Sequence, residues 1–180
     1  MMHRMQRTVL PLTVTILLAA LTGCDTCKPG KPGPIGKYNI EVTLDESLKS
    51  SSVLVDIVGV NGSNLPRWEA YDMGAYWRQS DPMRRDADKF VMNFVSGKSL
   101  TNSLPSTDPK WDQWKAKGVT HLLILADLPP AGLTSRPGNQ DARRQILPLD
   151  QCNWPSKTKT LSVLIQRSGI VAVTPTRFPK

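Results

Sequence analysis

Short alternating or apolar runs, bounded by Gly, Pro, Asn and Asp, recur along most of the chain, and this pattern is typical of β-strands. In the run 38–44, for example, Ile40, Val42 and Leu44 share one face. The pattern predicts seven strands, at 38–44, 51–60, 90–95, 119–127, 145–149, 160–166 and 170–175. They lack a regular alternation with helices, so we expect a mainly β protein, an antiparallel two-sheet β-sandwich.

Helical signals gather in two places. Asp81-Pro82 and Asp108-Pro109 each offer a capping side chain before a proline at the first helical position. The second pair leads into WDQWKAK, which ends at Gly118, a typical helix stop. The polar, aromatic-bearing segment 66–89 is the other candidate, and it predicts a small helical excursion after the second strand.

The N-terminus has the pattern of a secretory signal peptide. Arg4 and Arg7 precede a run from Thr8 to Ala20 that carries no charge. This run is too short for a membrane-spanning helix, which needs about 20 apolar residues. It ends in Leu-Thr-Gly-Cys, residues 21–24, which resembles the bacterial lipobox, although an ordinary signal peptide with a chance cysteine is the alternative. The resemblance implies that Cys24 is lipidated and becomes the first residue.

A lipobox implies several acyl chains, which hold a protein stably on a membrane surface without spanning it. We therefore divide the chain into a signal peptide (1–23), a lipidated Pro/Gly/Lys-rich tether (24–37) and a β-sandwich domain (38–180). The predicted location is the bacterial cell envelope, facing the periplasm. Asp25, directly after the anchor, is typical of inner-membrane retention in enterobacteria, so the choice between outer and inner membrane stays open.

The charge balance argues against nucleic acid. The formal charge of +8 falls to +6 without Arg4 and Arg7, and three of the remaining lysines lie in the tether. The domain is therefore only mildly basic and lacks the basic stripe of a nucleic-acid-binding protein. The tether lysines, Lys28, Lys31 and Lys37, are placed to interact with anionic lipid or simply to keep the segment soluble.

Two cysteines remain besides the anchor, Cys27 in the tether and Cys152 near the last strands. An oxidising envelope compartment permits a disulfide between them. The alternative, which we favour at this stage, is a free Cys152 buried as a small apolar residue.

No catalytic, metal-binding or cofactor-binding pattern stands out, and we expect no enzyme activity. Ser96-Gly97-Lys98-Ser99 lacks the first glycine of a phosphate-binding loop and is expected to be a turn. His121 is expected to be a hydrogen-bonded, partly buried imidazole, because a zinc site needs several converging ligands. Asp81, Asp86 and Asp88 alternate with basic residues, which favours a solvated, salt-linked helix face over general acid-base chemistry.

Four of the eleven aromatic residues fall within ten positions: Trp68, Tyr71, Tyr76 and Trp77. Such side chains are enriched at interfaces and can also stack on sugars. Their commonest use is to pack a helix on a sheet, as we also expect for Trp111 and Trp114. We therefore favour core packing and keep an aromatic binding surface as the alternative.

The order of features resembles the outer-membrane lipoprotein family of the type VI secretion system. The matching features are the lipobox, the short tether, the VDIVGV strand, the aromatic excursion and the THLLILADL strand. The resemblance implies a sandwich with an added helical element that holds an inner-membrane partner through the loop between the first two strands. Here that loop is Asp45 to Ser51, whose implied partner-binding residues are Asp45, Glu46, Ser47, Leu48 and Lys49.

Two functions follow from these observations. The first is a non-catalytic docking or scaffold subunit of a cell-envelope complex, bound to the membrane by its lipid and to an envelope protein by its loops. The second is a lipid-anchored module that binds a small molecule or glycan on the aromatic excursion. The loop DESLKSS is short for a protruding partner loop, and Asp25 departs from an outer-membrane address.

Overall fold

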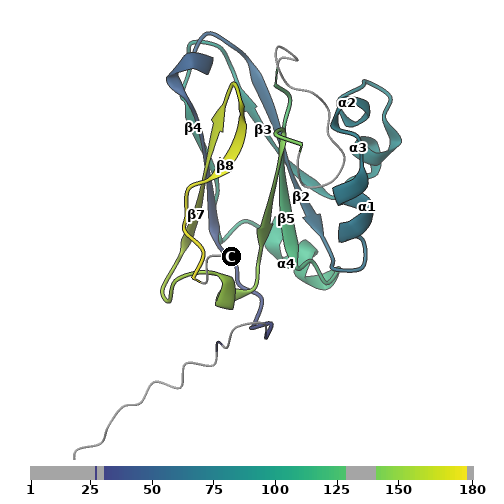
Figure 1. The fold of residues 1–180 in the computed structure, drawn as a ribbon, viewed down its shortest axis with the longest axis vertical. Coiled ribbons are helices and arrows are strands. Elements are labelled where there is room, and N and C mark those ends of the chain that lie inside the picture. Colours follow the sequence, from purple (N-terminus) through teal and green to yellow (C-terminus); the bar gives the residue numbers. More distant parts are fainter. Residues whose placement is uncertain (1–26, 28–30, 129–140, 178–180) are drawn as a thin grey trace, which may run out of the picture.

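The computed structural model describes residue 27 and residues 31–128 and 141–177 (Figure 1). Two four-stranded sheets pack face to face, and the fold is mainly β. Across the first sheet the strands run β4 (Thr101–Leu104), β1 (Asn39–Leu44), β7 (Thr160–Gln166) and β8 (Gly169–Ala172). Across the second they run β3 (Lys89–Phe94), β2 (Val53–Val60), β5 (His121–Ala126) and β6 (Arg144–Pro148).

The seven predicted strands are all present, with ends that differ by a few residues. The eighth, β4, was not predicted, because its sequence TNSL has a single buried side chain, that of Leu104. As an edge strand, β4 pairs only with β1 and needs no apolar alternation of its own. Its first three side chains are exposed.

The first sheet corrects the prediction of purely antiparallel packing. β1 and β7 pair in parallel, with Asn39 opposite Thr160 and Leu44 opposite Ile165. A parallel pair needs a long crossover connection, and here residues 45–159 lie between the two strands. Hydrophobic alternation shows which face a side chain occupies but carries no information about strand direction, so the sequence pattern could not reveal this pairing.

The main core lies between the two sheets, and a second core lies on the outer face of the β3-β2-β5-β6 sheet. Three short helices cover that outer face (Figure 1): α1 (Leu65–Ala70), α2 (Met73–Tyr76) and α3 (Pro82–Asp86). Val58, Val60, Leu123 and Leu125 of the sheet pack there against the helices. The helical excursion predicted after the second strand is therefore a layer that buries the second face of the sheet.

Helix α4 (Lys110–Ala116) packs into the main core with Trp111 and Trp114, as expected. The two indoles meet edge to face with centroids 5.3 Å apart. Gly59 allows α4 to lie close to β2, because a Cβ at this position would lie 2.5 Å from the Trp114 ring. The helix ends as predicted at Gly118, whose φ of +65° suits glycine.

The strands give the sandwich two ends that we name the N-terminal pole and the distal pole. The N-terminal pole contains residues 31–38, the 3₁₀ turn η3 (Gln151–Asn153) and the start of β7. The distal pole contains the 3₁₀ turn η1 (Glu46–Leu48), the β3–β4 turn and the β7–β8 turn. Figure 1 shows η1 at the top of the molecule and the N-terminal segment leaving from the bottom.

The segment before β1 is fastened to the N-terminal pole. Cys27 forms a disulfide with Cys152, so the expectation of a free, buried Cys152 is wrong. The amide of Gly33 donates to Asp150 Oδ1, and that of Gly36 to the carbonyl oxygen of Leu149. In the structure, the contacts of the domain thus begin before the boundary expected at residue 38. The physical reason is that Cys152 lies in η3, directly beside this segment.

Candidate functional site

The loop Asp45 to Ser51 is compact and held from three sides. The Asp45 carboxylate accepts from the Ser47 amide at 2.9 Å and caps η1, and this hydrogen bonding lowers the pKa of Asp45. Leu48 is fully buried in the main core. The exposed side chains are then Glu46, Ser47, Lys49 and Ser50. The loop is therefore a fixed polar ridge with a hydrophobic root.

Neighbouring turns brace this ridge at the distal pole. Arg167 of the β7–β8 turn donates to the carbonyl oxygen of Ser47 through Nε at 3.1 Å and through a terminal nitrogen at 2.6 Å. The amide of Gly97 in the β3–β4 turn donates to the carbonyl oxygen of Lys49 at 2.9 Å. Ser96 to Ser99 form this turn, with Gly97 at a φ of +72°, as expected of a turn. Segments far apart in the sequence thus make one continuous surface.

The aromatic excursion is partly core and partly surface. Trp68 and Tyr76 are buried in the second core, Trp68 at 8% exposure, which agrees with core packing. Tyr71 and Trp77 are only partly buried. Each of the two tyrosine hydroxyls donates to an aspartate, Tyr71 to Asp81 and Tyr76 to Asp56. Of the four aromatics proposed as a surface, Tyr71 and Trp77 are thus the two that are not fully buried.

Asp56 of β2 is the centre of a polar cluster on the face of the sheet that the short helices cover. Its carboxylate has no exposed surface and accepts from Tyr76 Oη at 2.9 Å and from Arg84 Nε at 3.0 Å. The Arg84 guanidinium also lies 4.5 Å from the Trp77 ring centroid. Burial beside Asp56 raises the pKa of Tyr76. The cluster joins the helices to β2 through Asp56 Oδ2, which accepts both hydrogen bonds, and this arrangement is structural.

Arg144 of β6 fixes the other end of the helical layer. Its guanidinium donates to the carbonyl oxygens of Trp68 at 2.8 Å, Glu69 at 2.7 Å and Tyr71 at 3.0 Å. These carbonyls lie at the end of α1, where a cation is favourable. Burial lowers the pKa of Arg144. No sequence signal marked this arginine, because its partners are backbone atoms distant in the chain.

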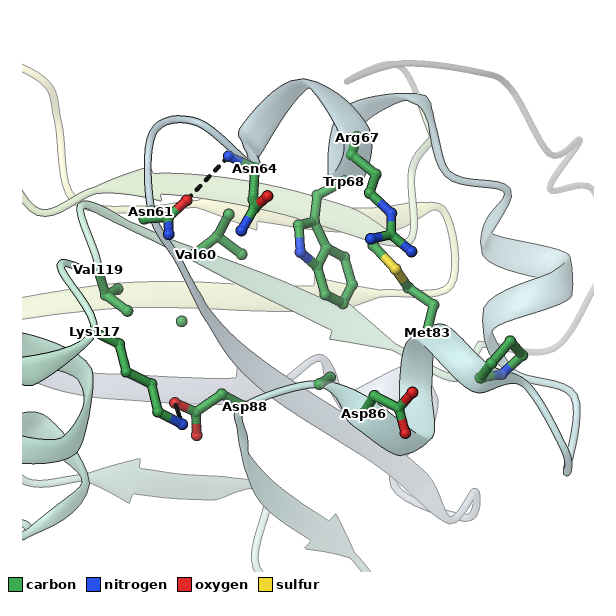
Figure 2. A pocket seen from close by; sticks show the side chains of 13 residues that line it. Val60, Asn61, Asn64, Arg67, Trp68, Met83, Asp86, Asp88, Lys117 and Val119 are labelled. Carbon is green, nitrogen blue, oxygen red and sulfur yellow. Dashed lines mark hydrogen bonds and ion pairs between the residues drawn. The ribbon is translucent and has the colours of Figure 1, made fainter.

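A half-open cavity of about 330 Å³ lies between α1, α3 and the end of α4. Figure 2 shows Trp68 and Arg67 on one wall and Lys117 beside Asp88 on the opposite side. Lys117 Nζ lies 2.9 Å from Asp88 Oδ2, and Lys110 also contacts Asp88. Burial acts to raise the pKa of Asp88, but the hydrogen bonds and the positive charges of the two lysines together lower this pKa below its ordinary value. The lining thus combines the indole of Trp68 with the amide side chains of Asn61 and Asn64 and with charged side chains.

The three aspartates weighed for acid-base chemistry do not form a pair. Asp81 is buried and caps α3 through the Arg84 amide, Asp86 is exposed beside Arg85, and Asp88 lies beyond the helix between its two lysines. Asp81 and Asp88 are thus less solvated than the predicted helix face. The difference arises because α3 ends at Asp86 and the chain then turns into β3.

His121 at the start of β5 is half-buried, and its Nδ1 lies 2.9 Å from Thr120 Oγ1, as expected. Among the residues that the structure describes, no group of three or more His, Cys, Asp or Glu side chains is placed to hold a metal ion. Within the same residues, no helix is long and apolar enough to cross a membrane.

The predicted signal peptide with its lipidation site Cys24 lies outside the described residues. The tether is described only at Cys27 and from Lys31 onward.

No protein-family model matches the sequence, and no curated protein matches it closely enough to count as a relative. Solved structures do match the fold. A chain of a structure described as a type VI membrane complex has a TM-score of 0.50 and 13% identity, over 78% of this chain and 99% of that one.

Two further matches are membrane proteins of the same secretion system. Serratia marcescens Lip, described as a membrane-bound component of the type VI secretion system, has a TM-score of 0.48 and 10% identity, over 76% of this chain and 96% of that one. The type VI lipoprotein TssJ1 from Pseudomonas aeruginosa has a TM-score of 0.46 and 13% identity, over 82% of this chain and 100% of that one. At these identities the likeness concerns the fold, and it agrees with the family resemblance found in the sequence.

Proposed function

We propose that this protein is a lipid-anchored, non-catalytic docking subunit of a cell-envelope complex of the type VI secretion kind. The anchor is the acylated Cys24, and the location is the periplasmic side of a bacterial membrane. The observation that carries the proposal is that the N-terminal segment and the Asp45 to Ser51 ridge lie at opposite poles of the sandwich (Figure 1).

This arrangement suits docking for a physical reason. A domain anchored at its N-terminal pole holds the distal pole away from the bilayer, where another envelope protein can reach it. The ridge is preorganised by Arg167 and the Asp45 cap, so little ordering entropy is lost on binding. The fold shared with a chain of a type VI membrane complex supports the same assignment.

The experiment is a mild-detergent pull-down of the native protein beside a Cys24→Ser variant, with mass analysis of the mature N-terminus and of co-purifying proteins. We expect an acylated Cys24 and one stoichiometric envelope protein. An unmodified cysteine would remove the anchor, and an acylated protein without a stoichiometric partner would contradict the docking role.

The ridge itself is tested by exchanging charges. Glu46 and Lys49 form an exposed ion pair of 3.3 Å, and a Glu46→Lys, Lys49→Glu exchange reverses its polarity at constant net charge. The matched control exchanges the exposed Arg85–Asp86 pair of α3 in the same way. We expect the first exchange to reduce partner recovery at least tenfold and the second to leave it unchanged. Equal recovery of both variants would place the contact elsewhere.

A second function, binding of a small molecule or glycan, is favoured by the cavity in Figure 2. Trp68 offers an aromatic edge, and Asn61, Asn64 and Arg67 offer hydrogen-bonding groups. The test is titration with soluble peptidoglycan fragments, followed by tryptophan fluorescence. Saturable binding that Arg67→Ala abolishes and Arg78→Ala preserves would support this function, and an unchanged signal would exclude it for that ligand class.

A further inference from the structure

A second cavity, of about 470 Å³, lies at the N-terminal pole. It is formed by the segment before β1, the region around η3 and the start of β7, and Cys27 is part of its wall. The side chains that matter for its chemistry are Tyr38 and four cationic residues, Lys37, Lys157, Lys159 and Arg177. These segments come from opposite ends of the sequence, so only the fold assembles this lining.

The lining is electrostatically one-sided. It contains four cationic residues and no carboxylate. Lys37 pairs with Asp112 at 2.6 Å, whereas Lys157 and Lys159 are exposed and make no ion pair with any residue that the structure describes. Asp150 lies nearby, and its Oδ1 accepts the amides of Gly33 and Cys152, but its single negative charge leaves the cations of the lining in excess. The cavity is therefore suited to an anion.

Two local features point to a ligand rather than to chance clustering. The Tyr38 hydroxyl is buried without a hydrogen-bond partner in the described part of the chain, although such groups are rarely left unpaired. Lys157 has a φ of +75°, a conformation that glycine or asparagine adopts more readily than lysine. A non-glycine residue in this region costs energy and occurs preferentially at binding sites. Here it places a cationic side chain at the cavity.

The disulfide sets how far this cavity can lie from the membrane. Only residues 25 and 26 separate the lipobox cysteine from Cys27. Three extended steps of chain span at most about 11 Å. Without the bridge, the first fixed point would be Gly33, and nine steps would allow about 30 Å. The bond between Cys27 and Cys152 therefore converts a long tether into a short one.

We propose that this cavity binds the phosphate of an anionic phospholipid headgroup, so that the N-terminal pole rests on the bilayer surface. The proposal rests on the lipid anchor proposed above, which brings the pole to the membrane. The headgroup layer of one leaflet is about 5–7 Å thick, so the two residues between Cys24 and Cys27 keep the lining cations within reach of the phosphates. Lysine, arginine and a phenol hydroxyl are suitable donors to phosphate oxygens.

Free phosphate has the same chemistry, but the geometry favours the lipid. A lipid headgroup is presented at a fixed height and at high local concentration, and the short tether keeps the cavity at that height. Each cation at an anionic surface strengthens binding about fivefold, the equivalent of about 1 kcal/mol. We therefore expect weak binding by the domain alone and firm orientation once the acyl chains hold it in place.

The test uses the chain from residue 24 with Cys24→Ser, oxidised, so that no acyl chain contributes. Its sedimentation is measured with vesicles of phosphatidylcholine containing 30 mol% (about one third) phosphatidylglycerol, and with vesicles of phosphatidylcholine alone. We expect binding to the anionic vesicles only, weakened about 25-fold by Lys157→Gln with Lys159→Gln. The matched control, Lys49→Gln with Lys98→Gln at the distal pole, has the same net charge and should bind as the parent does.

Several outcomes would overturn the proposal. Equal weakening by both double variants would show that net charge alone drives binding, and binding to neutral vesicles would show that the phosphate is not recognised. Tight binding of inorganic phosphate by calorimetry, without binding to anionic vesicles, would assign the cavity to a free anion. Because the assay contains neither acyl chain nor partner, its failure leaves the proposed docking function standing. Likewise, a failed pull-down would not affect this result.

Discussion

At the scale of single residues, the buried carboxylate of Asp56 carries the most specific interactions. Tyr76 and Arg84 both donate to its Oδ2, and the carboxylate itself has no exposed surface. Removing a hydrogen bond to a buried charge is more costly than removing one at the surface. We therefore expect Tyr76→Phe to lower the free energy of unfolding by about 1.5–3 kcal/mol, measured by urea denaturation.

The matched control for this prediction is Tyr71→Phe. Tyr71 donates to Asp81 at 2.7 Å, but it is partly exposed, and water can replace its hydroxyl. The loss should be about 1 kcal/mol or less. Equal losses in the two variants would show that burial of Asp56 does not strengthen its hydrogen bonds.

His121 gives the protein a defined pH dependence. Burial lowers the pKa of His121 below its ordinary value, against an opposing effect of Glu69 and Asp150. The unfolded chain therefore binds the proton first as the pH falls, with a pKa of about 6.5. The neutral, half-buried His121 therefore contributes its full stability above that pH. This contribution is lost as the pH falls through the lower pKa of the folded state.

The measurement compares urea unfolding at several pH values between neutral and about pH 5, for the parent and for His121→Gln. We expect the variant to lose stability less steeply on acidification. His121 is the single histidine after residue 24, so its imidazole titration by NMR is unambiguous. A folded-state pKa at or above that of the unfolded chain would contradict the prediction.

At the scale of elements, Gly59 shows how a helix can be packed on a strand. A methyl group there would lie 2.5 Å from the Trp114 ring, which is buried in the main core. We expect Gly59→Ala to lower the free energy of unfolding by about 1–3 kcal/mol through overpacking. Gly62→Ala is the control, because its nearest neighbour is Thr120 Oγ1 at 3.7 Å. An equal effect of both would exclude a steric cause.

Elements also show what hydrophobic alternation can and cannot predict. In the strand at 51–60, Val53, Val55 and Ile57 alternate with Ser52, Leu54 and Asp56, and the three apolar residues face the main core. Such alternation is typical of a strand with one polar face, yet Asp56 is fully buried. The short helices cover that face, and their position depends on contacts such as those of Arg144 that have no sequence period.

At the scale of the whole molecule, the disulfide between Cys27 and Cys152 closes a long loop, with a sequence separation of 125. In the chain beginning at residue 24 with Cys24→Ser, we expect Cys27→Ser to reduce stability by about 2–4 kcal/mol. Urea unfolding measures this loss, and reduction of the parent with dithiothreitol should reproduce it. An unaltered midpoint after complete reduction would contradict the prediction.

The orientation of the anchored molecule can be measured by lysine reactivity. In acylated protein bound to phosphatidylglycerol vesicles, a membrane-impermeant amine reagent should modify Lys157 at least fivefold more slowly than in detergent micelles. Lys98, in the β3–β4 turn of the distal pole, should react at the same rate in both. Reduction of the disulfide should restore the reactivity of Lys157, because the tether then lengthens. Equal rates for both lysines throughout would contradict a fixed orientation.

The sequence by itself determined the features that depend on neighbours along the chain. The seven recognised strands, the Asp81 cap of α3 and the stop at Gly118 follow from local alternation and backbone preference, and the Cys24 prediction likewise rests on a contiguous motif. Only the tertiary structure decided the parallel β1–β7 pair, the burial of Asp56, the Cys27–Cys152 bond and the cationic cavity. Each of these joins residues distant in sequence, and a contact between distant residues leaves no local period for the sequence to display.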